Sequence, residues 1–402
     1  MSTNIQKNQI TEGIIWRQLL LFFFPILLGT FFQQLYNTID SVIVGQFVGK
    51  EALAAVGGSS AQIVAFVVGF FTGLSSGASV TIAQFFGAKD SRSANKGLHT
   101  AYAIAAFGGL ILTVSGIILT PFLLEMMNTP ADIVADSAVY LRIYFAGIIF
   151  VLIYNMGSAI LRATGDSKRP LYYLIVCCII NIVLDVLFVI VFHMGVMGVA
   201  VATLIAQAVS AVLVTLKLMR SEGILKLSVK QIRFHGSILK MQLKLGLPTG
   251  FEAILFSITN IAIQSAVNTF GTDTTAAWSA YGKLDAIFWM VSTAFGIAIT
   301  TFVGQNYGAG KMDRVRKSTR VCLLMDFIVS AVLVVFLIAA RFLLFRLFTN
   351  DSHVIEIGCD MLVLITPWYI VYVFIEVIAG ALRGVGNVVV PVAITLLGVC
   401  LL

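Results

Sequence analysis

Charged residues are scarce in this 402-residue chain. Asp, Glu, Lys and Arg make up only 11% of it, whereas hydrophobic residues make up 59% and the mean hydropathy is +0.99. A soluble protein contains about 25% charged residues. The polar surface is therefore too small to cover a water-soluble globule, and we expect the lipid bilayer to be the solvent for most of the chain.

The sequence also lacks the usual signatures of enzymes and metal centres. It contains neither H-E-x-x-H nor G-x-S-x-G, its four histidines form no cluster, and its five cysteines show no metal-ligand spacing. Most of the cysteines lie in apolar runs, where we expect them to pack as small hydrophobic side chains. The first apolar run, beginning near Leu19, is too long for a secretory signal peptide. We therefore expect neither an enzyme nor a bound cofactor.

Two long segments of the chain resemble each other. The pattern L-R-x-x-G-x-x-x-x-P occurs at residues 161–170 and again at 382–391, an offset of 221 (382 − 161). Further matches continue upstream at offsets of 221 to 223, as far as Pro25 and Pro248. Duplicated halves are common in membrane transporters, with the binding site near the interface of the repeats. The chain is therefore predicted to consist of two copies of one unit.

Apolar runs long enough to cross a bilayer as helices, about 20 residues each, follow one another in both copies. The first copy has six, and an even number means that both copies enter the membrane from the same side. We predict an all-α polytopic membrane protein built from two parallel six-helix repeats. The predicted parts are an N-terminal lobe (1–217), a linker (218–243) and a C-terminal lobe (244–402) with four complete spans and a partial fifth.

The second copy is shorter than the first. Leu402 corresponds to position 181 of the first copy (402 − 221), and the last apolar run, from Pro391, would be about 18 Å long as a helix, which does not span. From the repeat we expect a protein of roughly 440–450 residues. The alternative is a natural protein with an incomplete second half.

Basic residues alternate between the predicted loops. Lys and Arg gather at 89–96, 162–169, 217–244 and 311–320, whereas the intervening loops are acidic. By the positive-inside rule, the N-terminus, the linker and the basic loops are expected in the cytoplasm. The net charge of +7 therefore mainly reflects which loops lie in the cytoplasm. Because it is spread over several short loops, we expect no nucleic-acid partner.

Two aspartates are expected at membrane depth, where ionisable groups are costly and mark ion or substrate paths. Asp40 lies toward the outer end of the first span, and Asp185 lies fifteen residues past Pro170, about 22 Å into the fifth. Asn181 and Asp185 are four residues apart and share a helix face. Thr203 lies at a similar depth in the sixth span. These oxygen-bearing side chains suit either a proton shared by coupled carboxylates or a small cation such as Na⁺.

Other polar residues in the apolar runs form a second candidate set. Glu252 and Glu376 are expected in the inner half of their spans, as a second cation site or as the lining of a cavity for positively charged substrates. Further candidates for that lining are Gln34, Tyr36 and Asn37. Pro25 removes a helix hydrogen bond and is expected to bend the first span, as a moving hinge or as a fixed bend. Asp326, six residues after Arg320, is expected at the membrane interface.

These segments resemble the multidrug and toxic compound extrusion (MATE) family, and most closely its DinF-like bacterial branch. The resemblance covers the chain from about residue 10 and is carried by PILLGTFFQQLYNTIDSVIVGQFVG (25–49), GLSSGASVTIAQFFGAKD (73–90), LRATGDSKRP (161–170) and NIVLDVLFV (181–189). It implies twelve helices in two six-helix lobes that form a V. It also implies a monomer that exports organic cations by alternating access, driven by influx of Na⁺ or H⁺.

The resemblance also implies roles for individual residues. The cation site in the first lobe of this family corresponds here to Asp40, Asn181, Asp185 and Thr203. The acidic residues that the family carries in its second lobe match Glu252 well and Glu376 only loosely.

The sequence therefore predicts a Na⁺- or H⁺-coupled multidrug antiporter of the bacterial inner membrane that exports small organic cations such as drugs and dyes. The alternative is a flippase for lipid-linked oligosaccharides from the same broader superfamily. A flippase must accommodate an anionic pyrophosphate. The buried charges here are mainly acidic, which favours cationic substrates.

Overall fold

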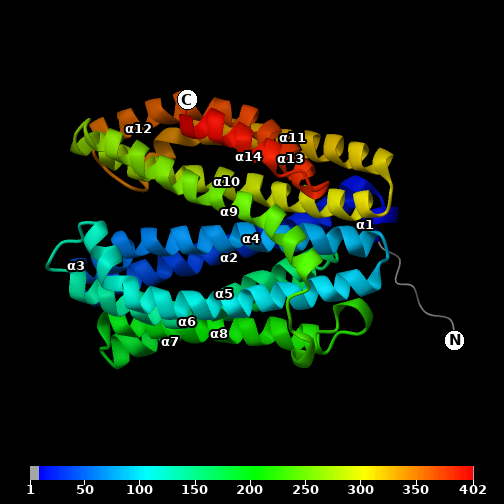
Figure 1. Cartoon of the computed structure of the whole chain (residues 1–402). Helices are drawn as coiled ribbons and strands as arrows, with labels where there is room; N and C mark the ends of the chain where they lie inside the picture. The colour runs from blue at the N-terminus through cyan, green and yellow to red at the C-terminus, as the bar shows by residue number, and fades with distance from the viewer. Residues whose placement is uncertain (1–8, 402) are drawn as a thin grey trace. The chain divides into compact units, whose positions relative to one another are not determined.

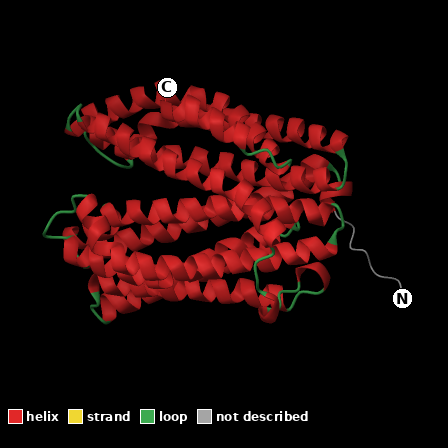
Figure 2. Ribbon diagram, viewed as in Figure 1, coloured by secondary structure: helices red, strands yellow, loops and turns green. Residues whose placement is uncertain are grey.

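The computed structural model describes residues 9–401, and every regular element in this part of the chain is a helix (Figures 1 and 2). The first repeat comprises α2 (Ile15–Phe47), α3 (Lys50–Gly57), α4 (Ser59–Gly87), α5 (Ser91–Met126), α6 (Val134–Ala163), α7 (Lys168–Asp185), which a π-helix (Val186–Val191) continues, and α8 (Gly195–Met219). The second comprises α9 (Gly236–Asn268), α10 (Thr272–Gly308), α11 (Met312–Arg346), α12 (Ser352–Ile365), α13 (Tyr369–Gly384) and α14 (Val389–Thr395), which a second π-helix (Leu396–Leu401) continues. A four-residue helix, α1 (Gln9–Glu12), precedes them.

Three turns confirm the duplication at the level of the backbone. Three positive φ angles of the first repeat recur in the second: Gly49 (126°) pairs with Gly271 (96°), Lys89 (57°) with Gly310 (71°), and Gly165 (96°) with Gly386 (91°). The members of each pair are 221 or 222 positions apart (310 − 89 = 221; 271 − 49 = 222). Because glycine adopts this conformation at little cost, these glycines suit the turns that end one helix and allow the next to begin.

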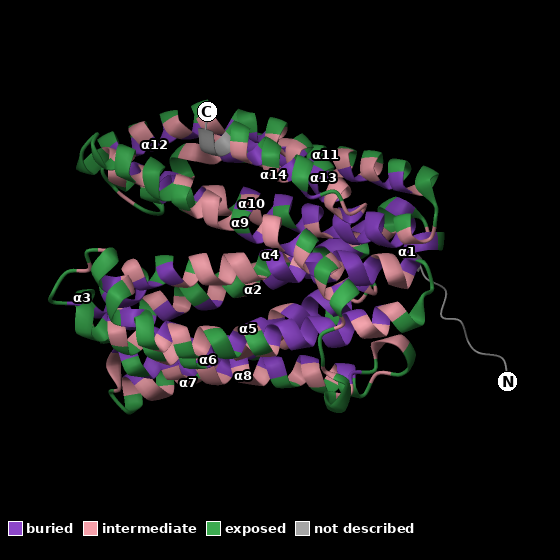
Figure 3. Ribbon diagram, viewed as in Figure 1, coloured by how far each residue is buried: buried purple, intermediate pink, exposed green. Residues whose placement is uncertain are grey.

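The outer faces of the helices are apolar. Large side chains such as Ile118, Val332 and Leu343 are 65–70% exposed. Figure 3 shows exposed positions along α11 and α12. Among the described residues, ten helical segments are long and apolar enough to cross a membrane. Apolar surface on this scale fits a lipid environment, because the hydrocarbon core offers no hydrogen-bond partner to an exposed polar group.

Contacts divide the chain into two units whose boundaries differ from those of the predicted lobes. The first unit comprises Leu28–Ile254, and the second comprises the residues before Leu28 and those after Ile254. Each of α2 and α9 therefore contributes its two halves to different units. In the second unit, Phe23 of α2 stacks on Phe295 of α10 with ring centroids 4.1 Å apart, which explains why the start of α2 belongs there. Pro25 lies close to the boundary, and α2 continues through it without a break.

In the first unit, small residues allow two helices to approach closely. Gly73 and Gly77 lie on α4, and Gly246 and Gly250 lie on α9, so each helix carries a pair of glycines four residues apart. A Cβ atom added at Gly73 would lie 2.5 Å from the Cα of Gly250, and one added at Gly246 would lie 2.8 Å from the carbonyl oxygen of Leu74. The two backbones are therefore in direct contact at this crossing.

The segment between α8 and α9 is held against α5 by hydrogen bonds. Asn95 donates from Nδ2 to the carbonyl oxygens of Ile224 (3.0 Å) and Lys226 (3.2 Å). His99 is 1% exposed, and its Nε2 accepts from the backbone N–H of Ser228 at 3.0 Å. The Nδ1 of His99 lies 2.8 Å from the carbonyl oxygen of Asn95, so this nitrogen donates. The two contacts assign the tautomer that carries its proton on Nδ1.

A second histidine lies where this segment joins α9. Nδ1 of His235 is 3.1 Å from the hydroxyl of Thr100. Desolvation, together with the charges of Arg233 and Lys96, lowers the pKa of His235 below its usual value. We therefore expect His235 to be neutral at pH 7. Its Nε2 accepts a hydrogen bond from Nε of Arg233 (3.4 Å), so Nδ1 carries the proton and donates to Thr100.

Replacing His99 by leucine is expected to loosen the linker. The variant loses two hydrogen bonds and leaves the N–H of Ser228 without an acceptor, a loss of about 1–3 kcal/mol. Tryptic cleavage after Lys226 and Lys230, followed by mass spectrometry in detergent, should become faster. His353→Leu, which replaces an exposed histidine (67%), is the matched control. An unchanged cleavage rate in His99→Leu would show that the linker is held by other contacts.

Candidate functional site

The structure brings together the four residues of the first candidate set, all within the first unit. Asp40 comes from α2, Asn181 and Asp185 come from α7, and Thr203 comes from α8; each is at most 7% exposed. The carboxylate of Asp40 interacts electrostatically with the side chains of Asp185, Thr203 and Asn181. Nδ2 of Asn181 also lies 3.4 Å from Oγ1 of Thr203. The site thus joins three helices through oxygen-bearing side chains.

Several oxygens of this group meet no hydrogen-bond donor. Within residues 9–401, this holds for Oδ1 of Asp40, Oδ1 of Asn181 and both carboxylate oxygens of Asp185. A buried acceptor without a donor costs about 1–3 kcal/mol, and more when it is charged. Asp40 and Asp185 both present acceptors, so a direct hydrogen bond between them requires a proton on one carboxylate. The oxygen set therefore fits a shared proton or a small hard cation such as Na⁺.

Two tyrosines of α6 lie beside this pair, although the sequence did not single them out. The rings of Tyr140 and Tyr144 stack with centroids 6.2 Å apart and an interplanar angle of 27°. Tyr140 interacts electrostatically with Asp40 and Asp185. The sequence feature that could have identified them is their spacing of four residues, which places both rings on one helix face.

Of the three polar α2 residues predicted to line a cavity, only Tyr36 is buried near the site. It is 6% exposed, and its hydroxyl accepts a hydrogen bond from Nε2 of Gln207 (3.3 Å). Tyr36 and Asp40 are four residues apart and share a helix face. Gln34 and Asn37 are exposed, so the structure does not group them with Asp40.

The two glutamates of the second candidate set belong to different units. Glu252 is 5% exposed and lies in the part of α9 that belongs to the first unit. Glu376 lies on α13 in the second unit, where its Oε2 accepts from the hydroxyl of Tyr372 (3.3 Å). Its Oε1 is 3.7 Å from Nη1 of Arg383. Glu376 is therefore paired with a base of its own helix.

Asp326 corrects an expectation drawn from the sequence. It was expected at the membrane interface, but its exposure is 0%. The reason is that α11 begins at Met312, so Asp326 lies fourteen residues (326 − 312), or about 21 Å, along the helix. Its Oδ1 accepts a hydrogen bond from Ser330 at 3.1 Å.

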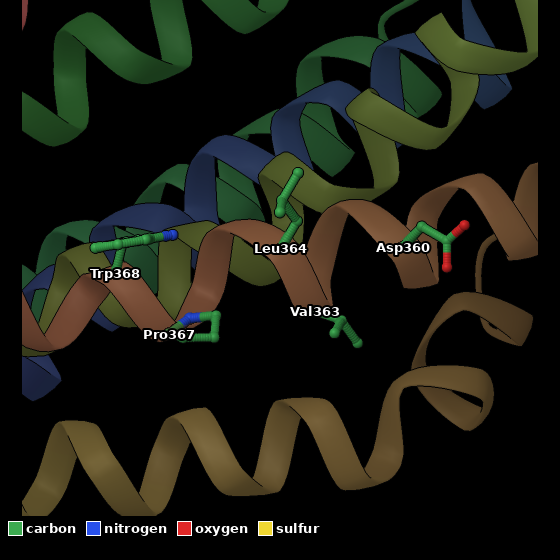
Figure 4. A pocket seen from close by; sticks show the side chains of 5 residues that line it. All are labelled: Asp360, Val363, Leu364, Pro367 and Trp368. Atoms are coloured by element: carbon green, nitrogen blue, oxygen red, sulfur yellow. The ribbon is translucent and has the colours of Figure 1, made fainter.

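An open pocket lies along α12 and the turn that follows it (Figure 4). Its lining side chains are Asp360, Val363, Leu364, Pro367 and Trp368. All five are exposed, and the lining combines one carboxylate with apolar groups. A specific site for a small ligand usually has several convergent polar groups. This pocket therefore resembles a lipid-facing groove more than a substrate site.

Comparison with known proteins identifies the family. The sequence matches the family described as MatE over residues 25–187 and 248–402. It is 30% identical over 393 residues to the probable multidrug resistance protein YoeA of Bacillus subtilis, covering 96% of this chain and 84% of that protein. It is 27% identical over 407 residues to the probable multidrug resistance protein NorM of Thermotoga maritima, covering 98% and 85%.

Solved structures share the fold. One described as the outward-facing conformation of a multidrug resistance MATE family transporter of the MOP superfamily matches with a TM-score of 0.90 at 22% sequence identity, covering 98% of this chain and 88% of that one. The predicted fold class and the expectation of a transporter rather than an enzyme are thereby confirmed. This chain belongs to the MatE family of multi-pass membrane transporters.

Proposed function

We propose that this protein is a multidrug exporter that couples outward movement of organic cations to inward movement of Na⁺ or protons. The observation that carries the proposal is the buried pair of Asp40 and Asp185, in which Oδ1 of Asp40 and both carboxylate oxygens of Asp185 meet no hydrogen-bond donor among the described residues. Relatives named multidrug resistance or multidrug export proteins support the export of drugs. Buried acids favour positively charged substrates over anionic ones.

The proposal includes a location and an orientation. The basic loops support a cytoplasmic N-terminus and linker in a bacterial inner membrane. The protein acts as a monomer in this scheme and needs no cofactor beyond its coupling ion.

In the proposed cycle, Asp40 and Asp185 bind the coupling ion when they are accessible from outside. Its positive charge neutralises the pair and weakens the attraction of the site for a cationic drug, which then leaves outward. Release of the ion to the cytoplasm restores the negative charge, and a new drug binds. Coupling requires that ion and drug bind the two access states with different affinities. Pro25 is the place where α2 would bend as the ion binds and leaves.

The test is transport by the purified protein in proteoliposomes loaded with ethidium. A Na⁺ gradient and a pH gradient are imposed separately, each directed opposite to the movement of the dye, and a K⁺ gradient of the same size is the control. We expect either the Na⁺ gradient or the pH gradient to drive ethidium movement, which names the coupling ion. Absence of movement under both would contradict coupled export of organic cations and favour the flippase alternative.

A further inference from the structure

An aromatic residue of the linker, Phe234, lies on the outer surface of α5 in the first unit. Its ring makes an edge-to-face contact with that of Phe107, with ring centroids 5.9 Å apart. Phe234 is 45% exposed and Phe107 is 56% exposed. An aromatic pair that stays this exposed is surface rather than protein core. Phe234 therefore extends the apolar surface of the span onto the linker.

Phe107 begins a stripe of exposed apolar side chains along α5. The spacing of these residues places them on one helix face, and the stripe continues with Leu110, Ile111, Val114 and Ile118. Lys96 precedes Phe107 by eleven residues (107 − 96), which is close to three full turns. It therefore lies on the same face, about 16 Å nearer the start of α5. A base thus stands at the end of the apolar stripe.

A second base comes from the linker, directly beside Phe234. Arg233 is exposed, and its Nε donates to Nε2 of His235 at 3.4 Å. The charges of Arg233 and Lys96 both act on His235. Nδ1 of His235 lies 3.1 Å from the hydroxyl of Thr100, which holds the histidine against α5. The two bases therefore lie around one anchored side chain.

The protein does not neutralise these two bases. In the described part of the chain, Lys96 and Arg233 form no ion pair, and the two Nη groups of Arg233 meet no acceptor. Of the acids nearest in sequence, Asp90 caps α5 by accepting from the N–H of Ser93 (3.0 Å). The other, Glu222, is exposed and lies eleven residues before Arg233 (233 − 222). The free side of a guanidinium suits the oxygens of a phosphate.

We propose that this part of the first unit binds one anionic phospholipid of the bilayer. Arg233 and Lys96 hold the phosphodiester, and an acyl chain lies along Phe234 and the stripe that begins at Phe107. Cationic side chains at one end and apolar surface at the other match the two parts of such a lipid. The orientation proposed above places this lipid in the cytoplasmic leaflet. Its binding rests neither on that orientation nor on ion coupling.

The repeat shows that the fold itself does not require this exposed pair of linker residues. At an offset of 223, the largest found in the repeat, Arg233 and Phe234 correspond to Ile10 and Thr11 (233 − 223; 234 − 223). Ile10 is 6% exposed and Thr11 is 7% exposed. In the second unit, buried neutral residues therefore take the place that an exposed base and an exposed ring take in the first. Substitutions of Arg233 or Phe234 should leave the fold intact.

The test is native mass spectrometry of the purified protein in a nonionic detergent. The protein is titrated with phosphatidylglycerol, with phosphatidylethanolamine, which has no net charge, and with glycerol 3-phosphate. We expect the first phosphatidylglycerol to bind about fivefold more tightly than the first phosphatidylethanolamine, and glycerol 3-phosphate not to displace it. Arg233→Gln should weaken phosphatidylglycerol binding about fivefold, the usual effect of one cation near an anionic lipid, and leave phosphatidylethanolamine binding unchanged. Arg233→Lys keeps the charge and should retain most of the affinity.

Two further variants separate a defined site from a diffuse basic surface. Lys230→Gln removes another exposed linker cation and is the matched control, which should bind phosphatidylglycerol as the wild type does. Phe234→Ala should weaken both lipids, because it removes only apolar contact. The midpoint of thermal unfolding without added lipid checks that each variant is folded.

Three results would overturn the lipid site: equal affinity for the two lipids, equal losses in Lys230→Gln and Arg233→Gln, or displacement of phosphatidylglycerol by glycerol 3-phosphate. The readout is independent of transport. If neither ion gradient drives ethidium while phosphatidylglycerol binds as expected, the proposed function fails and this inference stands.

Discussion

Replacing Asp40 by asparagine should reduce ion-driven ethidium efflux about 100-fold, equivalent to about 3 kcal/mol of coupling free energy. Asparagine keeps the size of the side chain and an oxygen that can accept a hydrogen bond, but it neither binds a proton nor carries a charge. The second copy has Ala262 or Ile263 at the corresponding position, so the fold does not require an acid there. The variant should therefore fold and bind dye, and the loss should appear in the dependence of efflux on the ion gradient in proteoliposomes.

The partner residue provides a stricter form of this experiment. Asp185→Asn should cause a similar loss, and the double variant should be little worse than either single variant, because two carboxylates that share one ion act as a unit. Glu51→Gln, which neutralises an exposed acid of α3, is the matched control and should transport normally. Efflux close to wild type in Asp40→Asn would exclude this pair as the coupling site.

Adding a methyl group at the crossing of α4 and α9 should destabilise the first unit. Gly73→Ala and Gly77→Ala are each expected to lower the free energy of unfolding by about 1–3 kcal/mol, the usual cost of overpacking. At Gly73 the new atom would meet Gly250, and at Gly77 it would meet the carbonyl oxygen of Gln242 and the backbone of Gly246. Backbone atoms cannot rotate aside as the end of a side chain can. The measurement is the midpoint of thermal unfolding in detergent.

The control for this prediction should change stability in the opposite direction. Apart from its chain neighbours and the adjacent backbone of α10, no described atom lies within 4 Å of a Cβ atom added at Gly282, which is exposed. Gly282→Ala should therefore stabilise the helix by up to about 1 kcal/mol, because alanine has the higher helix propensity. If Gly73→Ala raised the unfolding midpoint as Gly282→Ala does, the close approach of α4 and α9 would be wrong.

The grouping of the first candidate site was predictable because it depends on helix spacing and depth. Asn181 and Asp185 share a face by their separation of four residues, and helix rise places Asp40 and Thr203 at a similar level. Tyr140 has the same kind of spacing to its neighbour but was not predicted. Aromatic residues occur throughout apolar helices, so their presence alone does not mark a site.

The sequence by itself determined the membrane class, the duplication, the positions of the spans and the family resemblance, because hydropathy, periodicity and helix rise are local properties. Only the tertiary structure decided how each helix is rotated: that Gln34 and Asn37 are exposed, that Asp326 is buried, and that the halves of α2 and α9 belong to different units. A helix that is apolar on all sides gives no signal of which face meets protein and which meets lipid. That choice depends on contacts between residues far apart in the chain, such as Phe23 with Phe295.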